Sequence, residues 1–391
     1  MLHCINSLIL PSASLRILYS ASLRLPPGGT LELPIERLRY RAGVRVRPAS
    51  LRLASGPSAL LDDEMAIPAE MLKALQTAGL VSSDPVVTAL TGGVSCDIWK
   101  VEDGGRAFAV KRALPKLRVA AEWLADPARN FHEQEYIRYV AGFLPDAVPQ
   151  IVFSGPEFFA MEFLGGEFSD WKKSLLAGHA DTVVAERVGS TLARIHRESW
   201  LDPALARSFD TDKNFYDLRI AAYLLSTAEK NPASAGAIRA EADRLGKTKV
   251  ALVHGDYSPK NLMVAPGRLV VLDCETAWFG DPAFDMAFLL NHLLLKGLHH
   301  APAAEPFHKL VDAFLLAYRT TSPLHAPEVE SRASKLLPML TLARVDGKSP
   351  VEYLTDERKK HFVRAFTSHP IQNSTSLEVL VSDWFRSVAA H

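Results

Sequence analysis

The stretch from Val253 to Asp285 constrains the fold of this chain more than any other part of the sequence. It reads Val-His-Gly-Asp-Tyr-Ser-Pro-Lys-Asn, then, from residue 271, Val-Leu-Asp-Cys-Glu, and, from residue 280, Gly-Asp-Pro-Ala-Phe-Asp. Two apolar runs within 262–272 lie on either side of Pro266, and this pattern predicts a β-hairpin. Such a hairpin brings Asn261 and Asp273 together across its open end.

Polar side chains of this stretch have the spacing that phosphoryl transfer uses. Asp256 is placed to orient a substrate hydroxyl and to accept its proton. Asn261 and Asp273 offer one neutral and one charged oxygen ligand for Mg²⁺ on ATP. Two alternatives stay open for each of the remaining groups. Glu275 either binds a second metal ion or supports the metal site without binding the metal. Lys260 either reaches a phosphate or faces solvent.

A second signal lies upstream, where a β-rich segment ends in a lysine. Alternating runs on either side of Asp103-Gly-Gly105 predict a hairpin whose second strand ends at Lys111. Just before this hairpin, adjacent glycines let backbone N–H groups approach a polyphosphate, although a tight turn explains a Gly-Gly pair equally well. The candidate phosphate-binding residues are Gly92, Gly93, Val94 and Ser95.

Lys111 needs a carboxylate partner if it projects into a cleft, and Glu133 is the predicted one. The following helix has an apolar stripe that includes Ile137 and Val140. Glu133 lies four residues before Ile137 and continues this stripe, whereas Glu135 points to the opposite face. We therefore predict Lys111, Glu133 and Asp256 as catalytic residues.

Two further β-rich runs, 151–153 and 158–163, predict strands that lead to a hinge. The hinge is the segment Leu164-Gly-Gly166. Backbone groups near Glu162 and Leu164 are candidates for pairing with the adenine of ATP.

Beyond the hinge the sequence predicts mostly helices. Helical spacing covers Val183–His196, Phe215–Leu225 and Ala235–Leu245, and the apolar run Met286–Leu295 indicates a buried helix that is too short to span a bilayer. Several polar residues have predicted supporting roles, in bracing the catalytic loop, capping a helix or packing: His254, Asp285, Asp281 and His196.

These patterns predict an α+β protein of two lobes, with a small antiparallel β-sheet lobe over 65–165 and a larger helical lobe over 166–391. Residues 1–64 have a different composition, because they contain arginine but no lysine and few acidic residues. A false start or a disordered extension explains this composition, and so does a targeting peptide. In each case the segment lies outside the predicted fold.

Composition restricts the partners of the chain. The 44 basic and 44 acidic residues balance, which removes the electrostatic reason to expect a nucleic acid or a membrane surface as partner. Cys4, Cys96 and Cys274 are too few and too scattered for a disulfide framework or a zinc site. We expect a reducing, cytoplasmic setting.

The ordered motifs resemble the aminoglycoside phosphotransferase and choline kinase superfamily over roughly residues 80–300. The motifs are Thr91-Gly-Gly-Val-Ser95, Ala109-Val-Lys111, Met161-Glu-Phe-Leu-Gly165, His254–Asn261, and Asp273 followed by Gly280–Asp285. The resemblance implies a protein-kinase-like fold with ATP and Mg²⁺ as cofactors. It also implies Asp256 as base, Asn261 and Asp273 as metal ligands, and Lys111 as a phosphate contact.

A narrower resemblance is to methylthioribose kinases. It is carried by Lys111-Arg-Ala-Leu-Pro115, Arg118, Glu122-Trp123, Arg129 with Glu133, and Asp273-Cys-Glu275. Those kinases generally lack an asparagine at the position of Asn261, and Gly280-Asp-Pro282 is closer to the aminoglycoside kinases. Cys96 replaces an asparagine that often follows the glycine motif. The resemblance therefore indicates the family of this chain but not its substrate.

The acceptor site of such enzymes is expected on helices of the second lobe. The candidates here are Asp217, Arg219, Arg344, Asp346 and Lys348, of which Arg344 and Lys348 suit an anionic group and Asp346 a cation. The near charge balance of this lobe favours a neutral sugar, a nucleoside-like compound or an amino-alcohol over a polycation.

The predicted function is thus an ATP- and Mg²⁺-dependent phosphotransferase. It acts on a hydroxyl of a small molecule, which is a sugar, an aminoglycoside-like compound or an amino-alcohol. One alternative is a sugar kinase like methylthioribose kinase, and another is an inactive nucleotide-binding scaffold. A protein kinase is disfavoured, because Gly255 precedes Asp256 where those enzymes have arginine.

Overall fold

The computed structural model describes residues 66–90, 95–115 and 126–390. The extension predicted over 1–64 lies outside the described residues. So do Gly92, Gly93 and Val94 of the predicted phosphate-binding segment, of which only Ser95 is described.

A five-stranded antiparallel sheet forms the first lobe, in the order β1-β2-β3-β5-β4. Its strands are β1 (Val86–Ala89), β2 (Cys96–Asp103), β3 (Arg106–Ala113), β4 (Ile151–Ser154) and β5 (Phe158–Glu162). The predicted hairpin joins β2 to β3. Gly104 and Gly105 at its turn have φ values of 56° and 78°, which a type I′ turn requires at both central positions.

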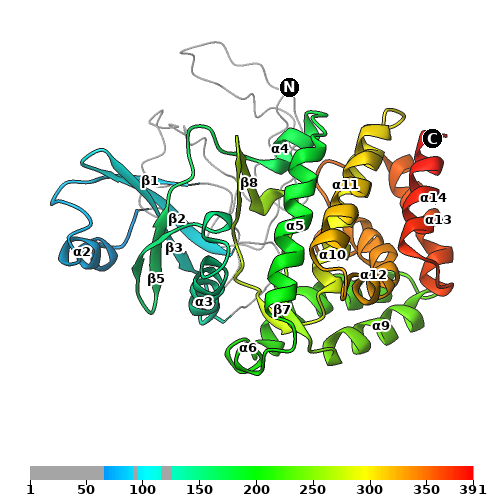
Figure 1. Cartoon of the computed structure of the whole chain (residues 1–391), viewed down its shortest axis with the longest axis horizontal. Coiled ribbons are helices and arrows are strands. Elements are labelled where there is room, and N and C mark those ends of the chain that lie inside the picture. The colour runs from blue at the N-terminus through cyan, green and yellow to red at the C-terminus, as the bar shows by residue number, and fades with distance from the viewer. Residues whose placement is uncertain (1–65, 91–94, 116–125, 391) are drawn as a thin grey trace, which may run out of the picture. The chain divides into compact units, whose positions relative to one another are not determined.

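A helix packs on each face of this sheet (Figure 1). On one face α2 (Ala69–Thr77) buries Met71 and Leu75 in a cluster with strand residues such as Trp99. On the other face α3 (Arg129–Ala141) buries its apolar stripe in a cluster that includes Phe159 of β5 and Leu252 of the second lobe. The helix that carries Glu133 therefore contacts both lobes.

The second lobe is mainly helical and contains two small antiparallel sheets. One sheet has the order β6 (Ser169–Asp170), β8 (Leu262–Ala265), β9 (Arg268–Val271), and the other pairs β7 (Ala251–Val253) with β10 (Trp278–Gly280). The helices are α4 (Trp171–Leu176), α5 (Thr182–Glu198), α6 (Pro203–Ser208), α7 (Asp212–Phe215), α8 (Ser226–Lys230), α9 (Ala235–Lys247), α10 (Ala283–His299), α11 (Glu305–Thr321), α12 (Ala326–Asp346), α13 (Glu357–Gln372) and α14 (Leu377–Ala389). Short 3₁₀ turns are η1 (Pro145–Ala147) and η3 (Pro259–Asn261). This architecture confirms the predicted α+β class.

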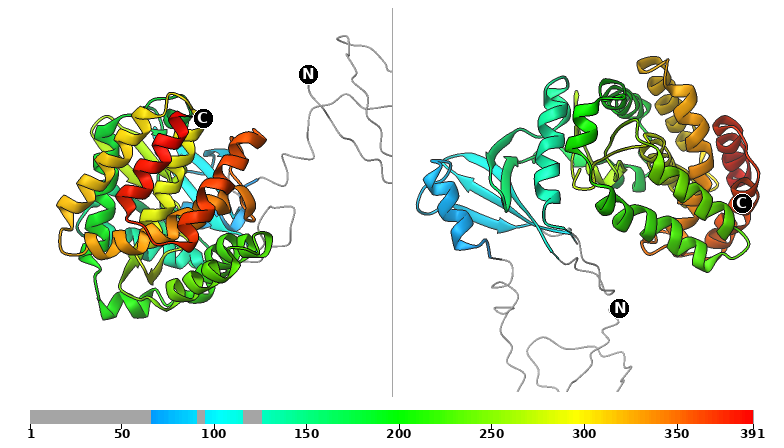
Figure 2. Two further views of the ribbon diagram at one scale, coloured as in Figure 1. Left: turned by 90° about the vertical axis from the view of Figure 1, so that its right-hand side faces the viewer. Right: turned by 90° about the horizontal axis from the view of Figure 1, so that it is seen from below.

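Helix α10 lies at the centre of the helical lobe. Every residue from Ala283 to Leu298 is buried, which confirms the buried helix predicted around the run 286–295. Helices α11, α12 and α14 pack against α10, and Figure 2 shows them side by side in yellow to red. Among the helices of the described residues, none is both long and apolar enough to cross a membrane.

The helix predicted over Phe215–Leu225 is less regular than its sequence pattern indicates. After α7, residues Tyr216–Leu225 form a π-helix, η2, before α-helical geometry returns in α8. A π-helix is a rare, wider helix that is often found at functional sites. Here it carries Arg219, which is buried and binds the loop after β7. Apolar spacing alone does not reveal this local change.

Candidate active site

The loop between β7 and β8 carries His254, Asp256 and Asn261, and it is fixed from within the second lobe. Gly255 has φ +78°, and a Cβ added there would lie 2.5 Å from the carbonyl oxygen of Thr276. Asp285, in the first turn of α10, accepts hydrogen bonds from the backbone N–H groups of His254 (2.7 Å) and Gly255 (2.9 Å). Asp285 therefore braces the loop as the sequence predicted.

Two histidines extend this network. The Asp256 N–H donates to His254 Nδ1 at 3.1 Å, so the opposite ring nitrogen, Nε2, is the donor to the carbonyl oxygen of Leu272 at 3.0 Å. Burial lowers the pKa of His254, which keeps the ring neutral. His196 contacts Asp285 Oδ2 at 3.3 Å and the Tyr318 hydroxyl at 2.8 Å. Both histidines support the loop.

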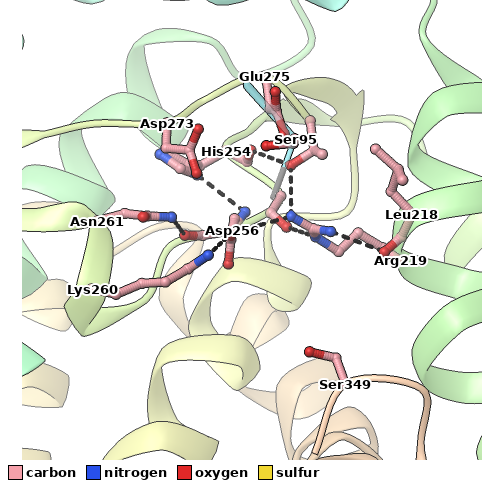
Figure 3. Close-up of polar contacts among 12 residues, drawn as sticks. Ser95, Leu218, Arg219, His254, Asp256, Lys260, Asn261, Asp273, Glu275 and Ser349 are labelled. Atoms are coloured by element: carbon pink, nitrogen blue, oxygen red, sulfur yellow. Dashed lines mark hydrogen bonds and ion pairs between the residues drawn. The ribbon is translucent and has the colours of Figure 1, made fainter. Parts of the chain in front are cut away.

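The Asp256 carboxylate lies between two cations. Its Oδ2 is 3.0 Å from Lys260 Nζ and 3.3 Å from Arg219 Nη2 (Figure 3). Burial disfavours the charged form of Asp256, but Lys260 and Arg219 outweigh burial and hold its pKa below the usual range. Arg219 also donates to the carbonyl oxygen of Gly255 and to Thr276 Oγ1. Asp256 is therefore an oriented anion at neutral pH.

The β8–β9 hairpin brings Asn261 and Asp273 to the same end, as predicted. The Leu272 N–H donates to the backbone oxygen of Asn261 at 2.9 Å, and Asn261 Nδ2 donates to the backbone oxygen of Asp256 at 2.9 Å. The side-chain oxygen of Asn261 accepts no hydrogen bond from any described residue. Asp273 has φ +63°, a region that non-glycine residues rarely occupy and that recurs at active sites.

Lys111 pairs with two carboxylates, Glu133 in the first lobe and Asp273 in the second. Its Nζ lies 2.8 Å from Glu133 Oε1 and 2.6 Å from Asp273 Oδ1. Burial disfavours the charged form of Asp273, but Lys111 and then Lys260 hold its pKa well below the usual range. Glu135, the alternative partner, instead pairs with Arg138. The structure thus brings the predicted Lys111, Glu133 and Asp273 into contact.

Glu275 has a partner that the sequence did not reveal. Its Oε2 accepts hydrogen bonds from Arg129 Nε at 2.9 Å and from Cys96 Sγ at 3.1 Å. Arg129 is almost fully buried, and it also donates to the backbone oxygens of Leu114, Asp126 and Ser95. Carboxylate oxygens of Glu133, Asp273 and Glu275 lie within 4.8 Å of one another, close enough to share a metal ion.

The predicted adenine-binding residues lie at and just after the end of β5. The Glu162 carboxylate pairs with Arg268 of β9 at 2.6 and 2.9 Å, and the Glu162 N–H donates to the backbone oxygen of Gln150. The backbone of Leu164 makes no hydrogen bond to any residue that the structure describes. Within the described ranges, the N–H and C=O of Leu164 therefore have no hydrogen-bond partner.

A cavity of about 200 Å³ opens beside Asp256. Its charged and polar lining includes Asp256, Lys260, Lys172, His292, Lys296, Arg344, Glu352 and Tyr353. Of the predicted acceptor-site residues, Arg344 lines this cavity. Arg219 forms an ion pair with Asp256, which also lines the cavity. Asp217 pairs with Lys213, and Asp346 pairs with Arg364. The sequence did not predict Lys296 as a residue of this site, because it directly follows the apolar run of α10.

Comparison with known proteins shows which family the chain belongs to. Residues 86–324 match the phosphotransferase enzyme family. The chain is 25% identical over 284 residues to the methylthioribose kinase of Exiguobacterium sibiricum, a match that covers 64% of this chain and 72% of that protein. It is 23% identical over 230 residues to the methylthioribose kinase of Bacillus mycoides, covering 51% of this chain and 58% of that protein.

A solved structure extends the likeness to the fold. The amicoumacin kinase hAmiN, in complex with AMP-PNP, Ca²⁺ and Ami, aligns with a TM-score of 0.50 at 15% identity, over 82% of this chain and 97% of that one. The family match extends over more than half of this chain, from β1 to the end of α11. The chain therefore belongs to the phosphotransferase enzyme family and is a small-molecule kinase of that family.

Proposed function

We propose that this kinase transfers the γ-phosphoryl group of ATP, in the presence of Mg²⁺, to a hydroxyl group of a small molecule. One observation carries the proposal. Asp256 is a buried anion that faces a cavity. Asn261, which donates to the backbone oxygen of Asp256, lies at the same hairpin end as Asp273, and Asp273 contacts Lys111. Positioning and charge are the main requirements of phosphoryl transfer, and this arrangement supplies both.

In the proposed ATP site, Lys111 contacts a phosphate while Glu133 fixes its ammonium group. Gly92, Gly93, Val94 and Ser95 approach the phosphates, and the backbone near Glu162 and Leu164 pairs with adenine. The N–H and C=O of Leu164, which have no partner among the residues that the structure describes, suit that pairing.

The donor set at Asn261 and Asp273 fits Mg²⁺, which prefers carboxylate and amide oxygens. The side-chain oxygen of Asn261 has no partner in the described part of the chain, and only Oδ1 of Asp273 contacts Lys111. Bound Mg²⁺ would neutralise phosphate charge there. Because Arg129 already neutralises Glu275, we propose that Glu275 supports the metal site without binding the metal.

Asp256 would act on the acceptor. Its carboxylate accepts a hydrogen bond from the hydroxyl, whose oxygen forms a bond to the γ-phosphorus while the bond to the leaving ADP oxygen breaks. The hydroxyl proton passes to Asp256. The lowered pKa of Asp256 fits a loose transition state, in which orienting the hydroxyl matters more than early removal of its proton.

The proposal is tested by measuring Mg²⁺-dependent transfer from ATP to a pool of small metabolites, with protein starting at Met65. We expect Asp256→Asn to lower kcat about 10²–10⁴-fold, the range for loss of a general base. The control is Asp243→Asn, which alters an exposed carboxylate on α9 and should retain full activity. Equal turnover by wild type and Asp256→Asn would exclude the role proposed for Asp256.

Methylthioribose is the first acceptor to test, because both relatives described above are methylthioribose kinases. Transfer to methylthioribose would identify a sugar kinase of that kind. An inactive nucleotide-binding scaffold has no need for the acidic side chain at Asp256, so it predicts no turnover in either protein.

A further inference from the structure

We propose that the acceptor of this kinase carries an anionic group, a phosphate or a carboxylate, which binds between Lys296 and Arg344 in the cavity beside Asp256. The inference rests on the proposed function, since the cavity is an acceptor site only if Asp256 receives the hydroxyl proton. It adds the chemical class of the substrate.

Lys296 is the first reason. It lies in the last turn of α10, is 1% exposed and lines the cavity. Its Nζ lies 5.0 Å from the centre of the Tyr353 ring, but it has no hydrogen bond or ion pair with any residue in the described ranges. A buried ammonium without a counter-charge is strongly unfavourable, so a ligand oxyanion is the natural partner.

Arg344 is the second reason. It lies on α12 and is 9% exposed. Its Nη1 donates to two neutral oxygens, Tyr223 Oη at 3.0 Å and Ser349 Oγ at 3.2 Å. Its Nε is buried without a hydrogen-bond partner, and no carboxylate of the described chain forms an ion pair with it. The guanidinium therefore has both charge and a donor to offer an oxyanion.

The other charges of the cavity do not compensate these two. Glu352 pairs with Lys172, and Asp256 pairs with Lys260. Outside the lining, Asp170 pairs with Lys173. His292 adds neither a negative nor a further positive charge, because burial and then Arg344 and Lys296 hold its pKa well below the usual range and keep the ring neutral. Lys296 and Arg344 thus remain as two basic groups that no carboxylate of the described residues pairs with.

A neutral hydroxyl donor is available for the same group. The Tyr353 hydroxyl is buried beside Lys296 and makes no hydrogen bond within the described structure. A phosphate or carboxylate oxygen would satisfy this hydroxyl together with the two cations. Lys296 of α10, Arg344 of α12 and Tyr353 of the segment after α12 therefore line one cavity, and a single bound oxyanion would serve as partner for all three.

The charge inside the cavity differs from the average charge of the second lobe, so the composition of the lobe predicted a neutral acceptor and not an anionic one. Near charge balance over the second lobe favoured a neutral acceptor, but composition averages surface pairs with the cavity. The volume of about 200 Å³ further favours a small acceptor over the larger ligands that fill typical pockets of about 300–1,000 Å³. We infer a compact hydroxy acid or hydroxyalkyl phosphate.

Protonation of Lys296 gives a second way to detect a bound anion. Burial, followed by the charges of Lys172 and Arg344, lowers its pKa to about 7, against opposing effects of Glu352 and Asp170. A bound anion favours the charged ammonium, so binding near pH 7 should be accompanied by proton uptake. A ligand that only fills space would leave protonation unchanged.

The test is calorimetric titration of the full chain with matched ligands. Ribose and methylthioribose are the uncharged members, ribose 5-phosphate is the phosphate member and ribonate is the carboxylate member. Each is titrated near pH 7 in two buffers that differ in ionisation enthalpy, which gives the number of protons taken up. The variants are Lys296→Met and, as matched control, Lys335→Met at an exposed position of α12.

We expect at least one anionic member to bind at least 10-fold more tightly than the uncharged members, with proton uptake. Lys296→Met should reduce this ratio to less than threefold and abolish the uptake, and Lys335→Met should change neither. Lys296→Met replaces a buried charge by an apolar side chain, so its fold should be retained, and a melting curve checks this.

The proposal is overturned if the anionic members bind no better than the uncharged ones, including the case in which none binds. It is also overturned if Lys296→Met retains the preference. Binding is measured without ATP turnover, so it is independent of the kinase test. Anion preference without transfer would remove the proposed function and leave an anion-binding site that serves no acceptor. Transfer to methylthioribose without anion preference would remove only the anionic acceptor.

Discussion

Gly255 shows how much the candidate site depends on a single backbone position. Its φ is +78°, and an added Cβ would lie 2.5 Å from a backbone oxygen, that of Thr276, which is not free to move away. Gly255→Ala must therefore shift the loop that carries Asp256. We expect a loss of stability of about 1–3 kcal/mol from the strained backbone, with a larger proportional loss of kcat. Urea unfolding and steady-state kinetics measure the two effects.

Gly267, at the β8–β9 turn, is the matched control for this substitution. It has nearly the same φ, +80°, but an added Cβ would meet nothing within 4 Å. Gly267→Ala should show the strain of a positive φ without the steric clash, and should leave kcat within about threefold of wild type. An equal fall in kcat for both variants would mean that backbone strain, not displacement of the loop, limits activity.

At the scale of elements, Arg129 holds α3 against β2, β3 and the second lobe. It contacts Glu275 in the second lobe and the backbone oxygens of Ser95 and Leu114, which lie on either side of the β2–β3 hairpin. Arg129→Gln leaves Glu275 buried without its counter-charge. We expect a loss of about 3–5 kcal/mol in the free energy of unfolding, as for one partner of a buried ion pair.

Two further variants separate the ion pair from packing. Adding Glu275→Gln to Arg129→Gln removes the uncompensated charge, so part of the lost stability should return. Arg138→Gln removes an exposed pair with Glu135 on the same helix and should change stability by less than about 1 kcal/mol. If the double variant is no more stable than Arg129→Gln, the ion pair does not account for the loss.

The same elements show what the sequence could predict. The hairpin that returns Asp273 to Asn261 follows from local alternation, and Glu133 follows from the stripe of one helix. The Arg129–Glu275 pair joins residues 146 positions apart, and no local pattern connects them. Lys296 stands at the end of an apolar run, and only the packing of α10 against its neighbours decides that its ammonium faces a cavity.

At the scale of the whole molecule, ATP would link the two lobes. Lys111 comes from β3 and Asp273 from the second lobe, so a ligand that contacts both residues stabilises the folded state of both lobes. A ligand at 100 times its dissociation constant adds about 2.7 kcal/mol. We expect ATP with Mg²⁺ to raise Tm by several degrees more than ATP with a chelator, measured by thermal unfolding.

Asp273→Asn tests whether the metal ligand carries this difference. Asparagine tolerates the positive φ of Asp273 better than most residues, so the variant should fold, and Lys111 keeps Glu133 as partner. The variant should lose most of the Mg²⁺-dependent increment in Tm and retain the part that ATP gives alone. Asp243→Asn, at an exposed position, should keep both parts. If Asp273→Asn keeps the full increment, Mg²⁺ binds without Asp273, and the proposed metal site lies elsewhere.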